Sequence, residues 1–305
     1  LPPLTSNSCG TDFTMPETYL NSSTEADLVI FVKALAMTDS TVAYASPCVF
    51  SSINTRPLAG VITINSNTFK ISYKKSIDYM YAFVHEMTHV LGFVNELFDY
   101  FPNGGSKLYT TKTKTTVAGT FTSVYSLLMP ELINHARTFF DCSTIESFDL
   151  ENQGEDGSKN SHFEVSFVGN EMMNSMAFDG IRLSKFTLTF LNSTGWYNID
   201  MSVAEVLTFG KGEGCAFMNS SCDASKFKDF CTVKNALYCS SDRLSKALCI
   251  STQFSDSCHI KIPENILSCS NSQFAEYLTT TEFIGVTSRC YETSSSGKVS
   301  AMCYE

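Results

Sequence analysis

The stretch HEMTHVLGFVNE, residues 85–96, has two histidines four residues apart with a glutamate directly after the first. On a helix, side chains at positions i and i+4 lie on the same face, so His85 and His89 can bind one metal ion together. Glu86 would then lie close enough to take a proton from a water molecule at that metal. This spacing predicts a zinc site with Glu86 as general base.

The alternative is that His85 and His89 are ordinary core or surface histidines of an amphipathic helix. The chain has only five histidines, and two of them flank a glutamate at this spacing and are followed by Gly92. Such a combination seldom arises by chance, so we favour the metal site.

A catalytic zinc site usually has three protein ligands and a water molecule, so a third ligand is needed. In the compact pattern HExxHxxGxxH this ligand stands at position 95, where the chain has Asn95, a poor zinc ligand. The remaining histidines are His135, His162 and His259. We expect His135 to be a surface residue of a helix and His259 to be structural. A glutamate such as Glu131 on a neighbouring helix is a further alternative.

The elements that would hold these residues begin with three β-rich runs, at 27–37, 41–46 and 59–65. Their β-branched residues and the turn residues between them predict three strands of one sheet. A helix is predicted from about Lys74, and Gly92 is placed to end it in a left-handed conformation. One face of this helix is expected to be core, with the apolar spacing of Ile77, Tyr81, Val84, Thr88 and Leu91.

Further along, residues 102–123 are rich in Gly, Thr and Ser, and we expect a loop there. Residues 129–142 predict a short helix with Pro130 near its start. Residues 185–197 predict a second core helix that ends near Gly195. Beyond Cys215 long periodic segments are absent from the sequence, and we expect a loop-rich module.

Composition narrows the class of protein. A chain of 305 residues is expected to fold as two domains. No apolar run approaches the length of about 20 residues that spans a bilayer. Net charge is −10, and lysines and arginines form no stripe, which argues against a nucleic-acid partner. We interpret the acidity as a solubility feature of a secreted protein.

The cysteines indicate disulfides. There are 12, ten of them from Cys142 onward, and their spacing lacks the CxxC pairs of a zinc ribbon. Disulfides imply an oxidising compartment and hence a secreted or cell-surface protein. The glycosylation sequons at Asn21, Asn192 and Asn219 agree with a secretory route.

The chain resembles the leishmanolysin family of zinc metalloproteases. HEMTHVLGF is similar to the family's HExxHxxG motif, and SHFEVSFVGNEMM is similar to the segment that carries the third histidine and a methionine-containing turn. CGTDFTMP, DLVIFVKAL, VAYASPC and PLAGVITIN resemble the family's strands, and STGWYNIDMSVAEVLTFGKGEGCAF resembles the segment after the turn. The resemblance extends from Cys9 to about Cys303.

This resemblance implies that His162 is the third ligand of one catalytic Zn²⁺ and that Met173, eleven residues later, is a hydrophobic floor beneath it. The implied fold is α+β, with a metzincin-type catalytic domain and a disulfide-rich module after it. We expect the first part of the catalytic domain in residues 1–92, its C-terminal subdomain in 93–215 and the Cys-rich module in 216–305.

The resemblance also implies a substrate strand and a set of disulfides. An extended peptide would add to the edge strand that holds Val42, Ala43, Tyr44 and Ala45. The implied disulfides are Cys9–Cys48, Cys142–Cys215, Cys222–Cys258, Cys231–Cys249, Cys239–Cys290 and Cys269–Cys303.

Family members begin with a pro-segment whose cysteine blocks the zinc, followed by a strand and a long helix that pack on the sheet. The given sequence starts at LPPLTSNSCG with none of these. We therefore expect one face of the sheet to lack its cover in this span, and a further N-terminal segment or a partner to supply it. Membrane anchoring outside this span is left open.

The implied function is a zinc-dependent endopeptidase, secreted or at the extracellular cell surface, that hydrolyses peptide or protein substrates. The alternative is a non-enzymatic surface or structural component that keeps the metzincin fold and works by adhesion or assembly.

Overall fold

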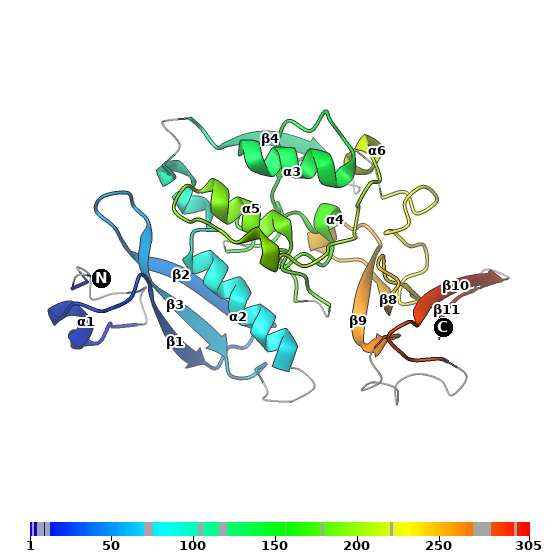
Figure 1. Cartoon of the computed structure of the whole chain (residues 1–305), viewed down its shortest axis with the longest axis horizontal. Coiled ribbons are helices and arrows are strands. Elements are labelled where there is room, and N and C mark those ends of the chain that lie inside the picture. Colours follow the sequence, from blue (N-terminus) through cyan, green and yellow to red (C-terminus); the bar gives the residue numbers. More distant parts are fainter. Residues whose placement is uncertain are drawn as a thin grey trace.

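The computed structural model describes residues 1, 3–4, 9, 13–69, 76–102, 106–115, 121–155, 157–177, 180–219, 222–270, 282–295 and 298–305. In Figure 1 a small sheet with one long helix lies at the N-terminal end, a helical part lies in the middle, and several strands lie at the C-terminal end. The mixture of helices with several separate sheets agrees with the predicted α+β class.

The N-terminal sheet has three strands, β1 (Val29–Leu35), β2 (Ala43–Phe50) and β3 (Pro57–Asn65). Their order is β1-β3-β2, with β1 parallel and β2 antiparallel to the central β3. The prediction of three strands in one sheet is confirmed. Strand β2 contains three of the four expected substrate-strand residues and lies at an edge of this sheet.

Helix α2 (Ser76–Val90) packs on the face of this sheet to which Gly60 belongs. A Cβ atom at Gly60 would lie 2.8 Å from Cγ2 of Val90 and 3.0 Å from the carbonyl oxygen of Ser46, so the bare glycine permits the helix to approach. The opposite side of α2 faces the large core of the middle part. The predicted core face is confirmed for Tyr81, Val84, Thr88 and Leu91.

The other face of the sheet is covered by the beginning of the chain. The segment that includes α1 (Glu17–Asn21) packs on β1, where the rings of Phe13 and Tyr19 each lie 5.1 Å from that of Phe31. Together with Leu4 and other apolar residues they form a small core. The expectation that this face lacks cover is therefore wrong for the end of the sheet near Phe31.

The expectation of a loop over residues 102–123 is wrong. Strands β4 (Tyr109–Thr115) and β5 (Phe121–Leu127) form an antiparallel pair, and β5 also pairs with the short β6 (Phe148–Asp149). Threonine favours strands because its branched side chain fits a pleated surface, so the Thr-rich composition that suggested a loop supports a hairpin. Residues 103–105 and 116–120 lie outside the described part.

Short helices build the middle of the chain. Helix α3 (Pro130–Phe140) begins with proline at its first turn, as predicted. Helix α5 (Lys185–Ser193) is the predicted second core helix, and the side chain of Ser184 caps its start. Helix α4 (Val165–Val168) and the 3-10 turns η2 (Asn95–Tyr100) and η3 (Met201–Val203) complete this part. They enclose a core dominated by phenylalanine rings.

After Cys215 the chain contains more strands than a loop-rich module should have. It holds α6 (Cys215–Met218), a three-stranded sheet of β7 (Leu237–Cys239), β8 (Ser245–Ile250) and β9 (Ile260–Ser268), and the turn η4 (Gln253–Ser255). A hairpin of β10 (Arg289–Ser295) and β11 (Lys298–Tyr304) follows. Strand β8 is buried at the polar residues Ser245 and Lys246 as well as at Ala247 and Cys249, so it lacks the alternation of apolar and polar residues that would have predicted it.

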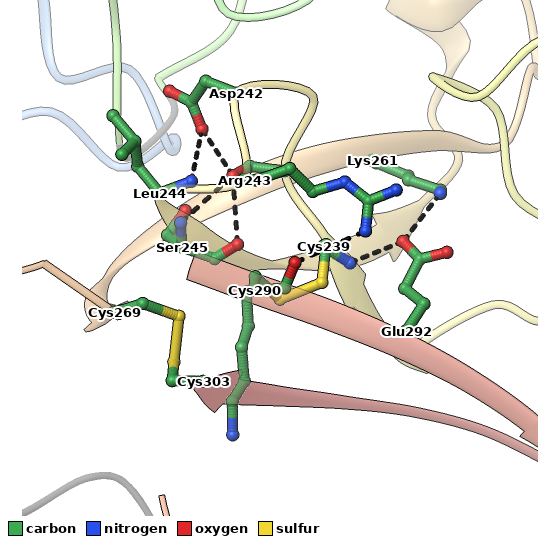
Figure 2. Close-up of a disulfide and its surroundings, with 12 residues drawn as sticks. Cys239, Asp242, Arg243, Leu244, Ser245, Lys261, Cys269, Cys290, Glu292 and Cys303 are labelled. Atoms are coloured by element: carbon green, nitrogen blue, oxygen red, sulfur yellow. Dashed lines mark hydrogen bonds and ion pairs between the residues drawn. A yellow bond between two sulfur atoms is a disulfide. The ribbon is translucent and has the colours of Figure 1, made fainter. Parts of the chain in front are cut away.

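Disulfides join these strands. Figure 2 shows Cys239–Cys290 and Cys269–Cys303 linking the β10–β11 hairpin to the β7–β9 sheet, with Lys261 and the amide of Cys239 both bonded to Glu292. All twelve cysteines are paired. The six pairs are those that the resemblance implies: Cys9–Cys48, Cys142–Cys215, Cys222–Cys258, Cys231–Cys249, Cys239–Cys290 and Cys269–Cys303.

The contact between α2 and the sheet yields a stability prediction. We expect Gly60→Ala to lower the free energy of unfolding by roughly 1–3 kcal/mol, because the added methyl group would overlap Val90. Gly285→Ala is the matched control, since a Cβ there would meet only Ser288 Oγ at 3.8 Å. In the double variant Gly60→Ala/Val90→Ala the losses should be less than additive in urea unfolding. Full additivity would contradict this packing.

Candidate metal centre

Three histidines from two parts of the chain converge in the interior. His85 and His89 lie one turn apart on α2, and His162 lies on the irregular segment between β6 and α4. Their Nε2 atoms form a nearly equilateral triangle, with separations of 3.0 Å for His85–His162, 3.1 Å for His85–His89 and 3.1 Å for His89–His162. Among the described residues this is a group whose side chains could hold a metal ion.

The outer ring nitrogen of each histidine is held by the backbone. Nδ1 of His85 lies 2.7 Å from the carbonyl oxygen of Met172, and Nδ1 of His162 lies 2.9 Å from that of Ser158. In His89 the corresponding partner is the carbonyl oxygen of Phe93, at 2.8 Å. Since a carbonyl can only accept, each Nδ1 carries the proton and each Nε2 presents its lone pair to the centre of the triangle.

The environment keeps all three imidazoles neutral. Burial lowers the pKa of His85 to about 4 and, with the charge of His85, that of His89 to about 3. Burial and the two neighbouring histidines hold the pKa of His162 well below its ordinary value. Three facing lone pairs without protons leave a site that a cation would satisfy.

The triangle fits zinc in particular. Imidazole nitrogens bind Zn²⁺ at about 2.0–2.1 Å, which at tetrahedral angles corresponds to nitrogen separations of roughly 3.3 Å. The observed 3.0–3.1 Å is close to that value. Hydrogen bonds from the outer ring nitrogen to a carbonyl are also usual for zinc-binding histidines. The three nitrogen donors and their spacing are therefore compatible with bound Zn²⁺.

A sharp turn after α2 helps to position His89 and the segment that carries His162. Gly92 has φ +124°, and a Cβ there would lie 2.9 Å from the ring of Trp196. Phe93 then returns toward the helix, where its carbonyl reaches His89. The side chain of Asn95 accepts a hydrogen bond from the hydroxyl group of Ser161, at 3.1 Å, and so ties the turn to the residue before His162.

Glu86 is buried on the same helix. Its side chain is 6% exposed, and Oε2 has no hydrogen-bond partner among the described residues. Burial raises its pKa to about 8. A buried carboxylate oxygen without a partner is costly unless water, a substrate group or a cation lies beside it.

Met173 is fully buried in a tight turn after α4. Its carbonyl oxygen accepts a hydrogen bond from the amide of Phe163, at 2.8 Å, and the carbonyl of the preceding Met172 faces His85. The turn therefore contacts both His85 of α2 and the neighbour of His162. Met173 is not among the residues whose polar atoms converge in the triangle.

Several buried carboxylates near the histidines were missed by the sequence analysis. Burial and the charge of Glu164 raise the pKa of Glu151 to about 9, and burial, opposed by Lys114, raises that of Glu164 to about 7. Lys114 of β4 lies 2.9 Å from Asp256. Burial also raises the pKa of Glu171 to about 7. Acidic residues inside apolar stretches, as in FEVSFVGNEMM, were the available signal.

Other candidate residues lie outside the cluster. Glu131 accepts a hydrogen bond from Asn192, at 2.9 Å, on the exposed side of α3. His135 packs against Phe186, with ring centroids 4.5 Å apart, and is half-buried where the sequence suggested a surface residue. His259 is a main-chain acceptor for Cys231.

The sequon asparagines differ in their surroundings. Asn21 and Asn219 are exposed. Asn192 is half-buried, and its amide group donates to Glu131 and accepts from the amide of Ile199. A glycan on Asn192 would have to replace these hydrogen bonds.

The low pKa values of the histidines predict how acid affects the metal-free protein. Below pH 6.5 His85 takes up a proton in the unfolded chain, whereas in the folded protein it stays neutral until about pH 4. The free energy of unfolding that His85 contributes therefore falls as the pH falls through this window. The buried glutamates, whose pKa values are raised, change the free energy of unfolding in the opposite direction as the pH falls. Wild type is therefore compared with His85→Gln, which keeps these glutamates. From pH 7 to pH 5 we expect wild type to lose on the order of 2 kcal/mol relative to this variant in urea unfolding. A constant difference would argue against a neutral buried His85.

Among the described residues, no helix combines the length and apolar character that a membrane span requires.

The family model described as Leishmanolysin (Peptidase_M8) matches residues 1–302.

Individual relatives agree with this match. A leishmanolysin homolog of Crithidia fasciculata is 28% identical over 254 residues, covering 81% of this chain and 37% of its own length. Leishmanolysin of Leishmania major is 27% identical over 247 residues, covering 79% of this chain and 39% of its own. Ciliated left-right organizer metallopeptidase of Danio rerio is 29% identical over 286 residues, covering 88% and 45%. The chain thus spans less than half the length of these relatives, and it belongs to the leishmanolysin family, a family of zinc metalloendopeptidases.

Proposed function

We propose that this protein is a zinc-dependent endopeptidase whose single catalytic zinc is held by His85, His89 and His162. The observation that carries the proposal is the convergence of three unprotonated Nε2 atoms within 3.0–3.1 Å of one another. Three histidine ligands leave one position of a tetrahedral zinc open for water or substrate, which is the arrangement of catalytic rather than structural zinc sites.

When bound, zinc would bring the pKa of a coordinated water to about 7 and polarise the carbonyl group of the substrate. Glu86 is proposed to take the proton from the attacking water and to give it to the leaving nitrogen. Its location on α2 directly after His85 supports this role. Its Oε2, which has no hydrogen-bond partner among the described residues, has the buried position that a proton acceptor for such a water needs.

The raised pKa of Glu86 is compatible with a base. Its value of about 8 results from burial. A divalent cation nearby would favour the charged carboxylate and lower this pKa. The three imidazoles, with their protons on Nδ1, add no positive charge of their own, so the cation would set the ionisation of Glu86.

Peptide substrates are proposed to lie along β2. In the described sheet β2 pairs with β3 alone, so its other edge is free among the described residues to accept an extended chain by main-chain hydrogen bonds. Val42, Ala43, Tyr44 and Ala45 form the start of this edge, and the side chain of Tyr44 is 42% exposed. Met173 is proposed as the hydrophobic floor beneath the zinc.

His85 and His89 lie in residues 1–92 and His162 lies in residues 93–215, which supports a metzincin-type arrangement in which these two parts share the zinc ligands. Residues 216–305 are the Cys-rich module of this arrangement. Six disulfides favour a secreted or extracellular cell-surface location. Exposed Asn21 and Asn219 are the sequons best placed for glycans.

Zinc content and cleavage of a quenched casein substrate test this function in the full-length protein after removal of any pro-segment. We expect about one zinc per chain in wild type and in Glu86→Gln, with cleavage lower by about 100-fold or more in Glu86→Gln because the general base is lost. His162→Ala should lose both zinc and cleavage. His259→Ala, which changes a histidine outside the triangle, should keep both.

Two results would redirect the assignment. If wild type holds zinc but cleaves nothing, the alternative of a non-enzymatic surface or structural component replaces the protease. If His162→Ala keeps zinc and activity, the third ligand is another residue.

A further inference from the structure

The turn at residues 171–174 contacts the metal centre through its backbone. The carbonyl oxygen of Met172 accepts the Nδ1 hydrogen of His85, at 2.7 Å, and the carbonyl oxygen of Met173 accepts the amide hydrogen of Phe163, at 2.8 Å. One ligand from α2 and the residue next to His162 are thus both oriented by consecutive peptide groups. A shift of this turn would move both.

A buried carboxylate holds the turn in place. Glu171 is fully buried, and its Oε2 accepts the amide hydrogen of Met173, at 2.5 Å. Its Oε1 accepts the hydroxyl hydrogens of Thr187, at 2.7 Å, and Ser184, at 2.9 Å. Three donors therefore meet this carboxyl group, and their hydrogen bonds favour its charged form against the effect of burial on its pKa.

The two hydroxyl donors come from the start of α5. Ser184 is the capping residue of this helix, where its Oγ also accepts the amide hydrogen of Phe186, and Thr187 lies in the first turn. A negative charge at this end of a helix is favoured by the helix dipole. Glu171 thus fastens the turn to an element that is itself fixed in the phenylalanine core through Phe186 and Phe190.

Main-chain bonds also hold the turn, since the amide of Met172 donates to the carbonyl of Arg182, at 2.8 Å. They fix the strand-like entry to the turn. The peptide group that joins Met172 to Met173 supplies the carbonyl for His85 from one atom and the amide hydrogen for Glu171 from another. Since this peptide group is planar, the side chain of Glu171 and the ring of His85 fix its orientation from opposite sides.

We propose that Glu171 is a positioning residue of the metal centre, which sets the direction of His85 Nε2 by fixing the Met172–Met173 peptide group. Glu171 is not among the residues that converge at the metal centre. The inference rests on the zinc site proposed above. It adds a residue that acts on the metal indirectly, through the Met172–Met173 peptide group and the imidazole ring of His85.

The test compares Glu171→Ala and Glu171→Gln with a matched buried acid, Asp229→Asn. Asp229 is also fully buried and also accepts a backbone amide, that of Gly210 at 2.7 Å, together with the hydroxyl of Ser241. It lies in the disulfide-rich part, away from the histidines. Zinc affinity is measured by competition with a chelator in the full-length protein, and the thermal midpoint of each metal-free variant is recorded beside it.

We expect Glu171→Ala to weaken zinc binding by about 10–100-fold, the effect usual for residues that orient metal ligands. Asp229→Asn should lower the thermal midpoint and leave zinc affinity within a factor of about two, because its hydrogen bonds do not reach a ligand. Glu171→Gln should recover part of the affinity, since its amide oxygen can accept the Met173 amide while the two hydroxyl groups rotate to accept its NH₂ group. Unchanged affinity in Glu171→Ala, or an equal loss in Asp229→Asn, would overturn the proposal.

A second readout needs no metal. In metal-free protein labelled with ¹⁵N-histidine, long-range ¹H–¹⁵N spectra should show His85 as the Nδ1–H tautomer in wild type and a mixture of tautomers in Glu171→Ala. An unaltered tautomer would count against the positioning role. Wild type that binds zinc without cleaving casein would refute the protease, whereas the affinity ratio and the tautomer would still decide the role of Glu171.

Discussion

Three imidazole lone pairs facing one another inside the protein are the constraint on which the rest of the structure depends. Neutral Nε2 atoms 3.0–3.1 Å apart repel, and each could escape by turning or by taking a proton. Turning is prevented by the carbonyl groups of Phe93, Ser158 and Met172, and protonation is opposed by burial. A cation at the centre changes this repulsion into attraction, so the site makes physical sense as a metal site.

Much of the surrounding fold serves to hold those three carbonyl groups. Gly92 turns the chain so that Phe93 returns to His89, and the ring of Phe93 stacks on Phe190 of α5 at 4.0 Å. Phe163, directly after His162, packs its edge on the ring of Phe93 at 4.9 Å. The core therefore positions backbone next to each ligand, and it does so with large rigid rings that have few rotamers to lose.

Local spacing was enough to predict part of this centre. His85, Glu86 and His89 share a helix, so their geometry follows from 3.6 residues per turn. His162 is 73 residues from His89, and spacing alone left it among several candidates until the family resemblance singled it out. The acceptor carbonyls and Glu171 could not be predicted, because backbone groups carry no sequence signal and a glutamate in an apolar stretch does not reveal its partners.

The fold shows the same division between local and distant information. Three strands and three helices followed from patterns within each segment, whereas the hairpin of β4 and β5 was missed because threonine suits both exposed strands and loops. The cover supplied by Phe13 and Tyr19 depends on a contact between distant segments of the chain. The prediction was therefore limited by contacts between distant segments and, for the hairpin, by residues that suit more than one local structure.

The positions of the disulfides imply that a bound metal ion would also stabilise the fold. Cys9–Cys48 lies within the N-terminal sheet region, and the other five pairs lie after Cys142, so the two parts that supply the histidines are joined by the chain and by noncovalent contacts. These contacts include Tyr81 with Glu205 at 2.7 Å and Trp196 with the carbonyl of Asn54 at 2.9 Å. Zinc bound by His85, His89 and His162 would cross-link these two parts, so its binding free energy would add directly to the free energy that holds them together.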